Sequence, residues 1–150
     1  QDAAFAAENS VRYVGMGTLF KEADIISVHL PLLPDTRHCI NRDTIIQMKP
    51  GVIIINTSRG GTIHSQDLAD AIKSGHVAAA GLDVFEDEGG QKKAVGTIFA
   101  GLDNVIMTPH VAGATHECFE AMMDKAIDMV KAFKAGEDIP CLLNPDYRRN

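Results

Sequence analysis

The stretch Val52-Ile53-Ile54-Ile55-Asn56-Thr57-Ser58-Arg59-Gly60-Gly61 decides the fold. It begins with four consecutive apolar residues, and apolar runs without alternation are typical of strands in a parallel sheet that is covered on both faces. Polar residues, an arginine and two glycines follow where the strand ends. Open parallel sheets bind ligands in the crevice at the carboxyl ends of their strands. The stretch therefore predicts a parallel α/β sheet with Arg59 at its ligand-binding edge.

Two other apolar runs end in the same way. Gly81 to Phe85 leads into an acidic segment that ends at Glu88, and Val105 to Thr108 leads through a proline to His110. An arginine, a glutamate and a histidine are thereby placed at or just beyond the ends of three strands. We interpret Arg59, Glu88 and His110 as a candidate catalytic set.

Three other acidic residues surround Glu88 in the sequence. Asp83 lies inside an apolar run, where a carboxylate needs a hydrogen-bonding partner. Glu86 and Asp87 are interpreted as residues of a solvated acidic loop. The other histidines, His29, His38, His64, His76 and His116, are interpreted as loop, surface or neighbour-contacting residues.

Strand and helix patterns alternate along the rest of the chain, which indicates βαβ units. We expect strands over residues 11–14, 24–30, 52–56, 77–84 and 105–108, and helices over 18–23, 43–48, 66–74 and 115–135. The architecture is a doubly wound parallel sheet, incomplete at its N-terminal side, with a long C-terminal helix. We interpret the Met- and Phe-rich stripe of that helix as core packing.

The segment Gly15-Met16-Gly17-Thr18-Leu19-Phe20 has the first two glycines of a dinucleotide-binding fingerprint. Phe20 replaces the third glycine, which allows close packing of helix on strand. The acid expected about 20 residues further on would be Asp35, which lies in a proline turn and not at a strand end. We therefore interpret the segment as a turn.

Composition narrows the function classes. The 150 residues carry a net charge of −6, which argues against nucleic acid as a partner, and no apolar run approaches the length of a membrane span. Three widely spaced cysteines, Cys39, Cys118 and Cys141, indicate reduced thiols in a cytoplasmic protein and no structural metal. Because the chain opens with Gln1 rather than Met, we expect an upstream segment.

The three strand-end residues suit one kind of chemistry. A guanidinium can bind a carboxylate through two parallel hydrogen bonds, and an imidazole can donate or accept a proton near neutral pH. A carboxylate beside the imidazole would favour its charged form. The set would hold a 2-keto or 2-hydroxy acid while its oxygen gains or loses a proton, and hydride exchange with a nicotinamide would complete the reaction. Taken singly, Arg59 is also compatible with a surface residue and His110 with a structural one.

The chain resembles the D-isomer-specific 2-hydroxyacid dehydrogenases, which include D-3-phosphoglycerate dehydrogenase, D-lactate dehydrogenase and the glycerate/hydroxypyruvate reductases. The matching segments are 23–31 with 34–38, 48–61, 81–88 and 103–113. The resemblance implies the C-terminal portion of such an enzyme, with a Rossmann-like fold. Residues 1–114 would be a partial dinucleotide-binding domain, and residues 115–150 would be a linking helix and tail that lead to the substrate domain.

The resemblance also implies residue roles. Arg59 would bind the substrate carboxylate, and His110 would be the acid/base with Glu88 paired to it. Asp83 would hydrogen-bond the nicotinamide carboxamide. The cofactor, NAD with NADP not excluded, would also be lined by Leu30, Pro31, Thr57, Ser58, Arg59, His110 and Gly113. A homodimer is expected from the likeness, and the 150-residue piece alone is expected to be inactive.

One departure and one alternative accompany the resemblance. Gly89-Gly90 follows Glu88 where the family usually has proline, so the loop that carries Glu88 would be looser. The C-terminal-binding protein corepressors resemble the same family and keep its dinucleotide site, so an NAD(H)-sensing scaffold is the alternative function. Val111 to Thr115 is more similar to the enzymes.

Overall fold

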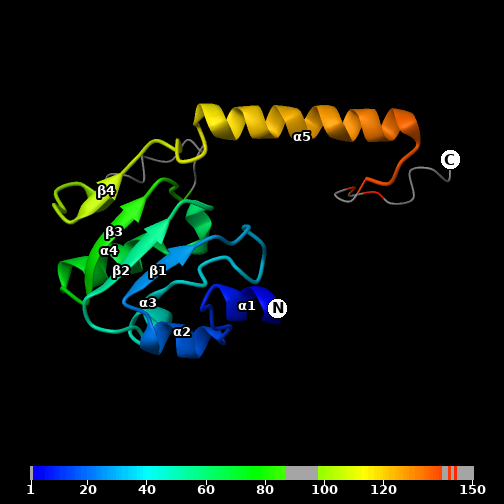
Figure 1. The fold of residues 1–150 in the computed structure, drawn as a ribbon. Helices are drawn as coiled ribbons and strands as arrows, with labels where there is room; N and C mark the ends of the chain where they lie inside the picture. Colours follow the sequence, from blue (N-terminus) through cyan, green and yellow to red (C-terminus); the bar gives the residue numbers. More distant parts are fainter. Residues whose placement is uncertain (1, 87–97, 140–141, 143, 145–150) are drawn as a thin grey trace. The chain divides into compact units, whose positions relative to one another are not determined.

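The computed structural model describes residues 2–86, 98–139, 142 and 144 (Figure 1). The chain divides into two compact units, residues 1–110 and residues 111–150. The first unit contains a parallel four-stranded sheet and its helices, and the second contains one long helix.

The sheet consists of β1 (Ile25–Val28), β2 (Val52–Asn56), β3 (Val77–Leu82) and β4 (Val105–Met107), in the order β1-β2-β3-β4. All neighbouring strands are parallel, which confirms the predicted sheet. Their last residues form one row, since Val28 pairs with Asn56, Asn56 with Leu82, and Leu82 with Met107. The four strands therefore end level with one another, and the segments that follow them emerge at one edge of the sheet.

The helices of the first unit are α1 (Ala3–Glu8), α2 (Met16–Glu22), α3 (Arg42–Ile45) and α4 (Ser65–Lys73), with a short 3₁₀ turn, η1 (Gly60–Thr62). The predicted helices over 18–23, 43–48 and 66–74 are confirmed within a few residues. At the end of α4, Ser74 is the C-cap and Gly75 follows with a φ of 79°, a left-handed conformation that glycine adopts without steric cost.

The core of the first unit lies on one face of the sheet. Alternate residues of β2, among them Ile54, are buried and pack with Phe20 of α2 and Leu68 of α4. The opposite face carries apolar side chains that are exposed in the described part of the chain, since Ile25 is 58% and Ile106 is 73% exposed. The described residues thus cover one face of the sheet, where the sequence pattern predicted cover on both.

The second unit is built on α5 (His116–Ala135), whose two ends were predicted correctly. The Thr115 side chain accepts a hydrogen bond from the Cys118 N–H, and Gly136 ends the helix in the left-handed conformation. The predicted burial of its apolar stripe is wrong for the described residues. Phe119, Met122, Met123, Ile127, Val130 and Phe133 are all between 45% and 61% exposed. None of the described helices has the length and hydropathy of a membrane span.

The segment 11–14 is not a strand, contrary to the prediction. It runs as irregular backbone into Gly15, the N-cap of α2. The two glycines that follow it therefore lack the preceding strand that a dinucleotide fingerprint requires, which agrees with the rejection of that motif. α1 was not predicted; its N-cap, Asp2, accepts a hydrogen bond from the Phe5 N–H.

Candidate active site

The turn that follows β2 is shaped by a buried asparagine. Asn56 Oδ1 accepts hydrogen bonds from the Ser58 backbone N–H (3.0 Å) and hydroxyl (2.9 Å). Asn56 Nδ2 donates to the carbonyl of Arg59 (3.1 Å) and lies 3.2 Å from Thr62 Oγ1. Because Asn56 is only 1% exposed, its amide is held firmly and fixes the backbone of the turn on which Arg59 sits.

Arg59 projects from this turn and is exposed. Its Nη1 donates to the carbonyl of Ser58 at 2.7 Å. A guanidinium has five N–H donors, so this bond occupies only a part of its capacity to bind an anion. Thr57, which follows β2 directly, is also exposed, whereas Ser58 is half-buried.

Asp83 lies one residue beyond β3 and is 4% exposed. The hydroxyl of Thr108 donates to its carboxylate, and its backbone N–H donates to the Asn56 carbonyl at 3.0 Å. Thr108 in turn donates its own N–H to the Leu82 carbonyl at 3.0 Å. These contacts join the ends of three neighbouring strands and satisfy the expectation that a carboxylate in an apolar run needs a hydrogen-bonding partner.

His110 lies three residues beyond the end of β4, is exposed, and has a φ of 58°. A non-glycine residue with positive φ is uncommon, although histidine is among the types enriched there. Leu30 and Pro31 are exposed and follow β1 at the same edge of the sheet. Gly113 belongs to the second unit, and Glu88 lies outside the described residues. Arg59, Asp83 and His110 therefore follow three adjacent strands at one edge.

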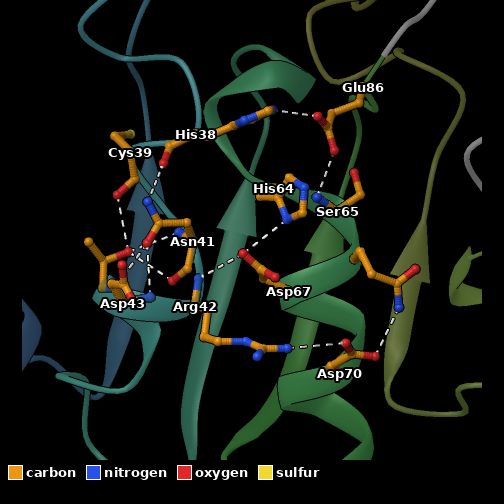
Figure 2. Close-up of polar contacts among 12 residues, drawn as sticks. His38, Cys39, Asn41, Arg42, Asp43, His64, Ser65, Asp67, Asp70 and Glu86 are labelled. Carbon is orange, nitrogen blue, oxygen red and sulfur yellow. Dashed lines mark hydrogen bonds and ion pairs between the residues drawn. The ribbon is translucent and has the colours of Figure 1, made fainter.

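A polar cluster beside this edge was not predicted (Figure 2). Glu86 Oε1 lies 2.6 Å from His38 Nε2, and Glu86 Oε2 accepts a hydrogen bond from the Ser65 N–H at 2.7 Å. The interpretation of Glu86 as a solvated loop residue is therefore wrong, since its side chain is only 18% exposed. Burial by itself would raise the pKa of the Glu86 carboxyl, but the hydrogen bonds from Ser65 and His38 together outweigh it and lower the pKa.

A second acid–histidine pair lies at the start of α4 in the same view (Figure 2). Asp67 Oδ2 lies 2.9 Å from His64 Nδ1 and accepts a hydrogen bond from the Arg42 N–H at 2.9 Å. Burial opposes ionisation of Asp67, yet these contacts lower its pKa. The His38 and His64 rings meet edge to face, with centroids 5.0 Å apart. In the part of the chain that the structure describes, no group of three or more histidine, cysteine or acidic side chains could hold a metal ion.

The polar groups at the sheet edge fit the nicotinamide end of a dinucleotide. A buried carboxylate, that of Asp83, is a hydrogen-bond acceptor of the kind that a primary carboxamide requires. Exposed backbone after β1 and β2 lies at the same edge, where open parallel sheets bind nucleotides.

Comparison with known proteins gives concordant results. Residues 1–112 match the family model for the NAD binding domain of the D-isomer specific 2-hydroxyacid dehydrogenases. A hydroxypyruvate reductase of Thermotoga maritima is 52% identical over 107 residues, which cover 71% of this chain and 35% of that protein. A glyoxylate reductase of Thermococcus litoralis is 42% identical over 139 residues, covering 93% of this chain and 41% of that protein.

A solved structure shares the fold. The D-lactate dehydrogenase of Aquifex aeolicus, complexed with NAD and lactic acid, has a TM-score of 0.78 at 35% identity, covering 91% of this chain and 45% of that one. The chain therefore spans less than half the length of each of these three proteins.

Proposed function

Because the chain belongs to the family of D-isomer specific 2-hydroxyacid dehydrogenases, we propose that the protein transfers a hydride between NAD(H) and a small acid, and so interconverts a D-2-hydroxy acid and the corresponding 2-keto acid. The resemblance that the sequence motifs indicated is confirmed by the family match. Hydroxypyruvate, glyoxylate, pyruvate and 3-phosphohydroxypyruvate are the substrates to test first, since relatives are named for reactions on such acids.

One observation carries the proposal. The strands end in a common row, and Arg59, Asp83 and His110 follow three adjacent strands within one to three residues of that row. A guanidinium, a buried carboxylate and an imidazole therefore follow the strand ends at the edge where parallel sheets bind ligands, which supports the proposal. A guanidinium can bind the substrate carboxylate, and an imidazole can exchange a proton with the carbonyl oxygen, and both are useful in the reduction of a 2-keto acid.

We assign the following tasks to these residues. Arg59 binds the substrate carboxylate and orients the carbonyl group. His110 donates a proton to the carbonyl oxygen during reduction and accepts it during oxidation, and Glu88 is its partner in this assignment. Asp83 hydrogen-bonds the carboxamide. Bound NADH supplies the hydride. The segments 30–31 and 57–59, together with His110 and Gly113, line the cofactor.

The wider expectations are part of the same proposal. Residues 1–114 serve as part of a dinucleotide-binding domain, and residues 115–150 lead to a substrate domain. The protein acts in the cytoplasm as a homodimer. Cys39 and Cys118 are free thiols, which suits a reducing compartment, and Cys141 lies outside the described residues.

The test is a substrate screen on the protein expressed from its complete reading frame. Oxidation of NADH and NADPH is followed at 340 nm with each of the four 2-keto acids, and product configuration is determined by chiral chromatography. His110→Ala is expected to reduce turnover by at least about 100-fold through loss of acid–base catalysis. His116→Ala, which removes an exposed histidine from α5, is the control and should match the parent protein.

Two results would contradict the proposal. The first is equal turnover by His110→Ala and the parent protein. The second is tight binding of NADH without turnover of any 2-keto acid, which would favour the scaffold function instead.

A further inference from the structure

The turn that carries Arg59 is paired with a segment that precedes it by more than 20 residues in sequence. The His38 N–H donates to the Gly61 carbonyl at 2.8 Å, and the Ile40 N–H donates to the Thr62 carbonyl at 3.1 Å. Ile40 and Ile63 form an isolated parallel bridge. The segment 38–40 thus pairs with residues 61–63 and supports η1, which begins directly after Arg59.

Glu86 connects the segment 38–40 to the start of α4 through its carboxylate. Its two carboxylate oxygens are divided between two elements, with Oε1 on His38 (2.6 Å) and Oε2 on the N–H of Ser65 (2.7 Å), as Figure 2 shows. Ser65 is the first residue of α4, which follows η1 after two residues. One side chain from the end of β3 therefore bridges the segment before β2 and the segment after it.

The backbone of Glu86 also lies against the turn. A Cβ atom on Gly60 would be 1.9 Å from the Phe85 carbonyl carbon and 2.5 Å from the Glu86 nitrogen, so the two backbones touch without a side chain between them. Gly60 is bonded covalently to Arg59. A shift of the 85–86 segment would therefore be transmitted to the residue that carries the guanidinium.

From these contacts we infer that Glu86 and His38 are positioning residues for Arg59. They hold the 59–62 turn in the position from which Arg59 binds the substrate carboxylate. The inference rests on the proposed function for the task of Arg59, and on geometry alone for the support of the turn. The pair touches neither substrate nor cofactor in this scheme. It acts by keeping the 59–62 turn in one place, since a displacement of about 1 Å can lower the rate of an enzyme about 100-fold.

The test compares two carboxylates of equal exposure in the protein expressed from its complete reading frame. Glu86 and Asp67 are each 18% exposed, each pairs with a histidine, and each accepts a backbone N–H, but only Glu86 lies against the Arg59 turn. Glu86→Ala is expected to lower kcat/KM for the 2-keto acid by about 10- to 100-fold, with a raised KM. Asp67→Ala should lose stability and keep the parent KM within about twofold, because Asp67 bonds His64 and Arg42 rather than Ser65, His38 or the 59–62 turn.

Two further measurements separate positioning from mere stability. Glu86→Gln keeps the acceptor for Ser65 and an amide that can pair with His38, and it should restore kcat/KM to within about threefold of the parent. Hydrogen exchange reports on the turn directly, because the Thr62 and Ile63 amides donate to the Arg59 and Gly60 carbonyls. Relative to the β2 amides, these two should exchange about tenfold faster in Glu86→Ala than in Asp67→Ala.

Failure of the inference and failure of the proposed function give different results. Equal KM values for Glu86→Ala and Asp67→Ala, or equal exchange of the Thr62 and Ile63 amides, would overturn the inference. A parent protein that reduces no 2-keto acid would overturn the proposed function, and the role in catalysis with it. In that case faster exchange in Glu86→Ala would still support Glu86 as the residue that holds the turn, and unaltered exchange would overturn that as well.

Discussion

Gly60 lies so close to Phe85 that a Cβ atom on Gly60 would be 1.9 Å from both the carbonyl carbon and the carbonyl oxygen of Phe85. Non-bonded heavy atoms do not approach one another this closely. No residue with a Cβ atom therefore fits at this position unless the backbone moves. The contact joins the turn after β2 to the segment after β3. The relative position of Arg59 and Glu86 therefore depends on the absence of a Cβ atom at position 60.

Gly60→Ala is accordingly expected to destabilise the protein and to reduce activity. Displacement of packed backbone should lower the free energy of unfolding by at least about 2 kcal/mol, at the upper end of the effects of overpacking. Urea denaturation followed by circular dichroism measures this change. kcat/KM should fall as well, since the turn that carries Arg59 has to move.

Gly61→Ala is the matched control for Gly60→Ala. A Cβ atom on Gly61 would be 3.1 Å from the nearest atom, a methyl carbon of Leu32, and a half-exposed side chain can move by a few tenths of an ångström. Its free energy of unfolding should stay within about 1 kcal/mol of the parent value. Equal losses for the two variants would show that the close approach of Gly60 to Phe85 does not constrain the turn.

Much of the fold follows from local signals in the sequence. β2 is bounded by Gly51 and by the polar residue Thr57, and the structure places it over the predicted residues. α5 begins after a threonine that can cap it and ends at Gly136, which supplies the left-handed conformation. These elements are predictable because the residues that start and stop them are neighbours in sequence.

The errors have a common origin in contacts between distant residues. Glu86 pairs with His38, 48 positions away. No sequence pattern in either segment predicts that the two side chains meet. Residues 11–14 have the composition of a strand but pair with no strand in the described chain. The stripe of α5 predicts a surface that packs on something, but periodicity does not say which part of a protein supplies the cover. Glu88 and its loop lie outside the described residues, so its pairing with His110 stays a prediction.

The hydroxyl of Thr108 should matter more than its shape. It donates to the buried carboxylate of Asp83, and hydrogen bonds to charged groups contribute about 1.5–3 kcal/mol. Thr108→Val keeps the β-branched shape and removes the donor, so it should lower the free energy of unfolding by about 2 kcal/mol. Thr108→Ser keeps the donor and should be close to the parent protein. Urea titrations of both variants decide the matter, and equal stability of the valine and serine variants would exclude a contribution from the hydroxyl.

Glu86 should make stability depend on pH in the acidic range. Its pKa in the folded protein is lowered from the ordinary value of 4.5 by the hydrogen bonds from Ser65 and His38, which outweigh the opposing effect of burial. A carboxyl whose folded pKa is depressed contributes stability above its unfolded pKa, and this contribution is lost as the pH falls through the folded pKa. The advantage of the parent over Glu86→Gln in free energy of unfolding should therefore be full at pH 6 and shrink below about pH 4.5.

Urea titrations of the parent and Glu86→Gln at intervals between pH 3 and pH 7 test this dependence. The difference between the two proteins isolates Glu86, because the other carboxyl groups titrate in both. Asp67→Asn supplies a comparison, since the pKa of Asp67 is lowered from an ordinary value of 3.8 and its difference should shrink at a lower pH. Stability curves of parent and Glu86→Gln that stay parallel throughout would contradict the lowered pKa of Glu86.

Arg59→Lys should be damaging although it keeps the positive charge. The proposed task of Arg59 is to bind a carboxylate through two parallel hydrogen bonds, and an ammonium group cannot reproduce that planar fork. The loss of about 1.5–3 kcal/mol of charge-assisted hydrogen bonding corresponds to a rise in KM of about 10- to 150-fold for the 2-keto acid. NADH binding should change less, because Arg59 is one of several residues proposed to line the cofactor, whereas no other residue is proposed to bind the substrate carboxylate. Steady-state kinetics with fluorescence titration of NADH measures both quantities.

Arg42→Lys is the control for Arg59→Lys. The Arg42 guanidinium is exposed and lies 4.0 Å from the Asp70 carboxylate, so that this ion pair joins α3 to α4. An exposed ion pair of this kind contributes little, so its kinetics should match the parent protein. If Arg59→Lys also matched the parent, two parallel hydrogen bonds from a guanidinium would not be needed to bind the carboxylate, and the proposed task of Arg59 would be wrong. A rise in KM confined to Arg59→Lys would identify the turn after β2, which Asn56 shapes and Glu86 supports, as the part of the sheet edge that recognises the substrate.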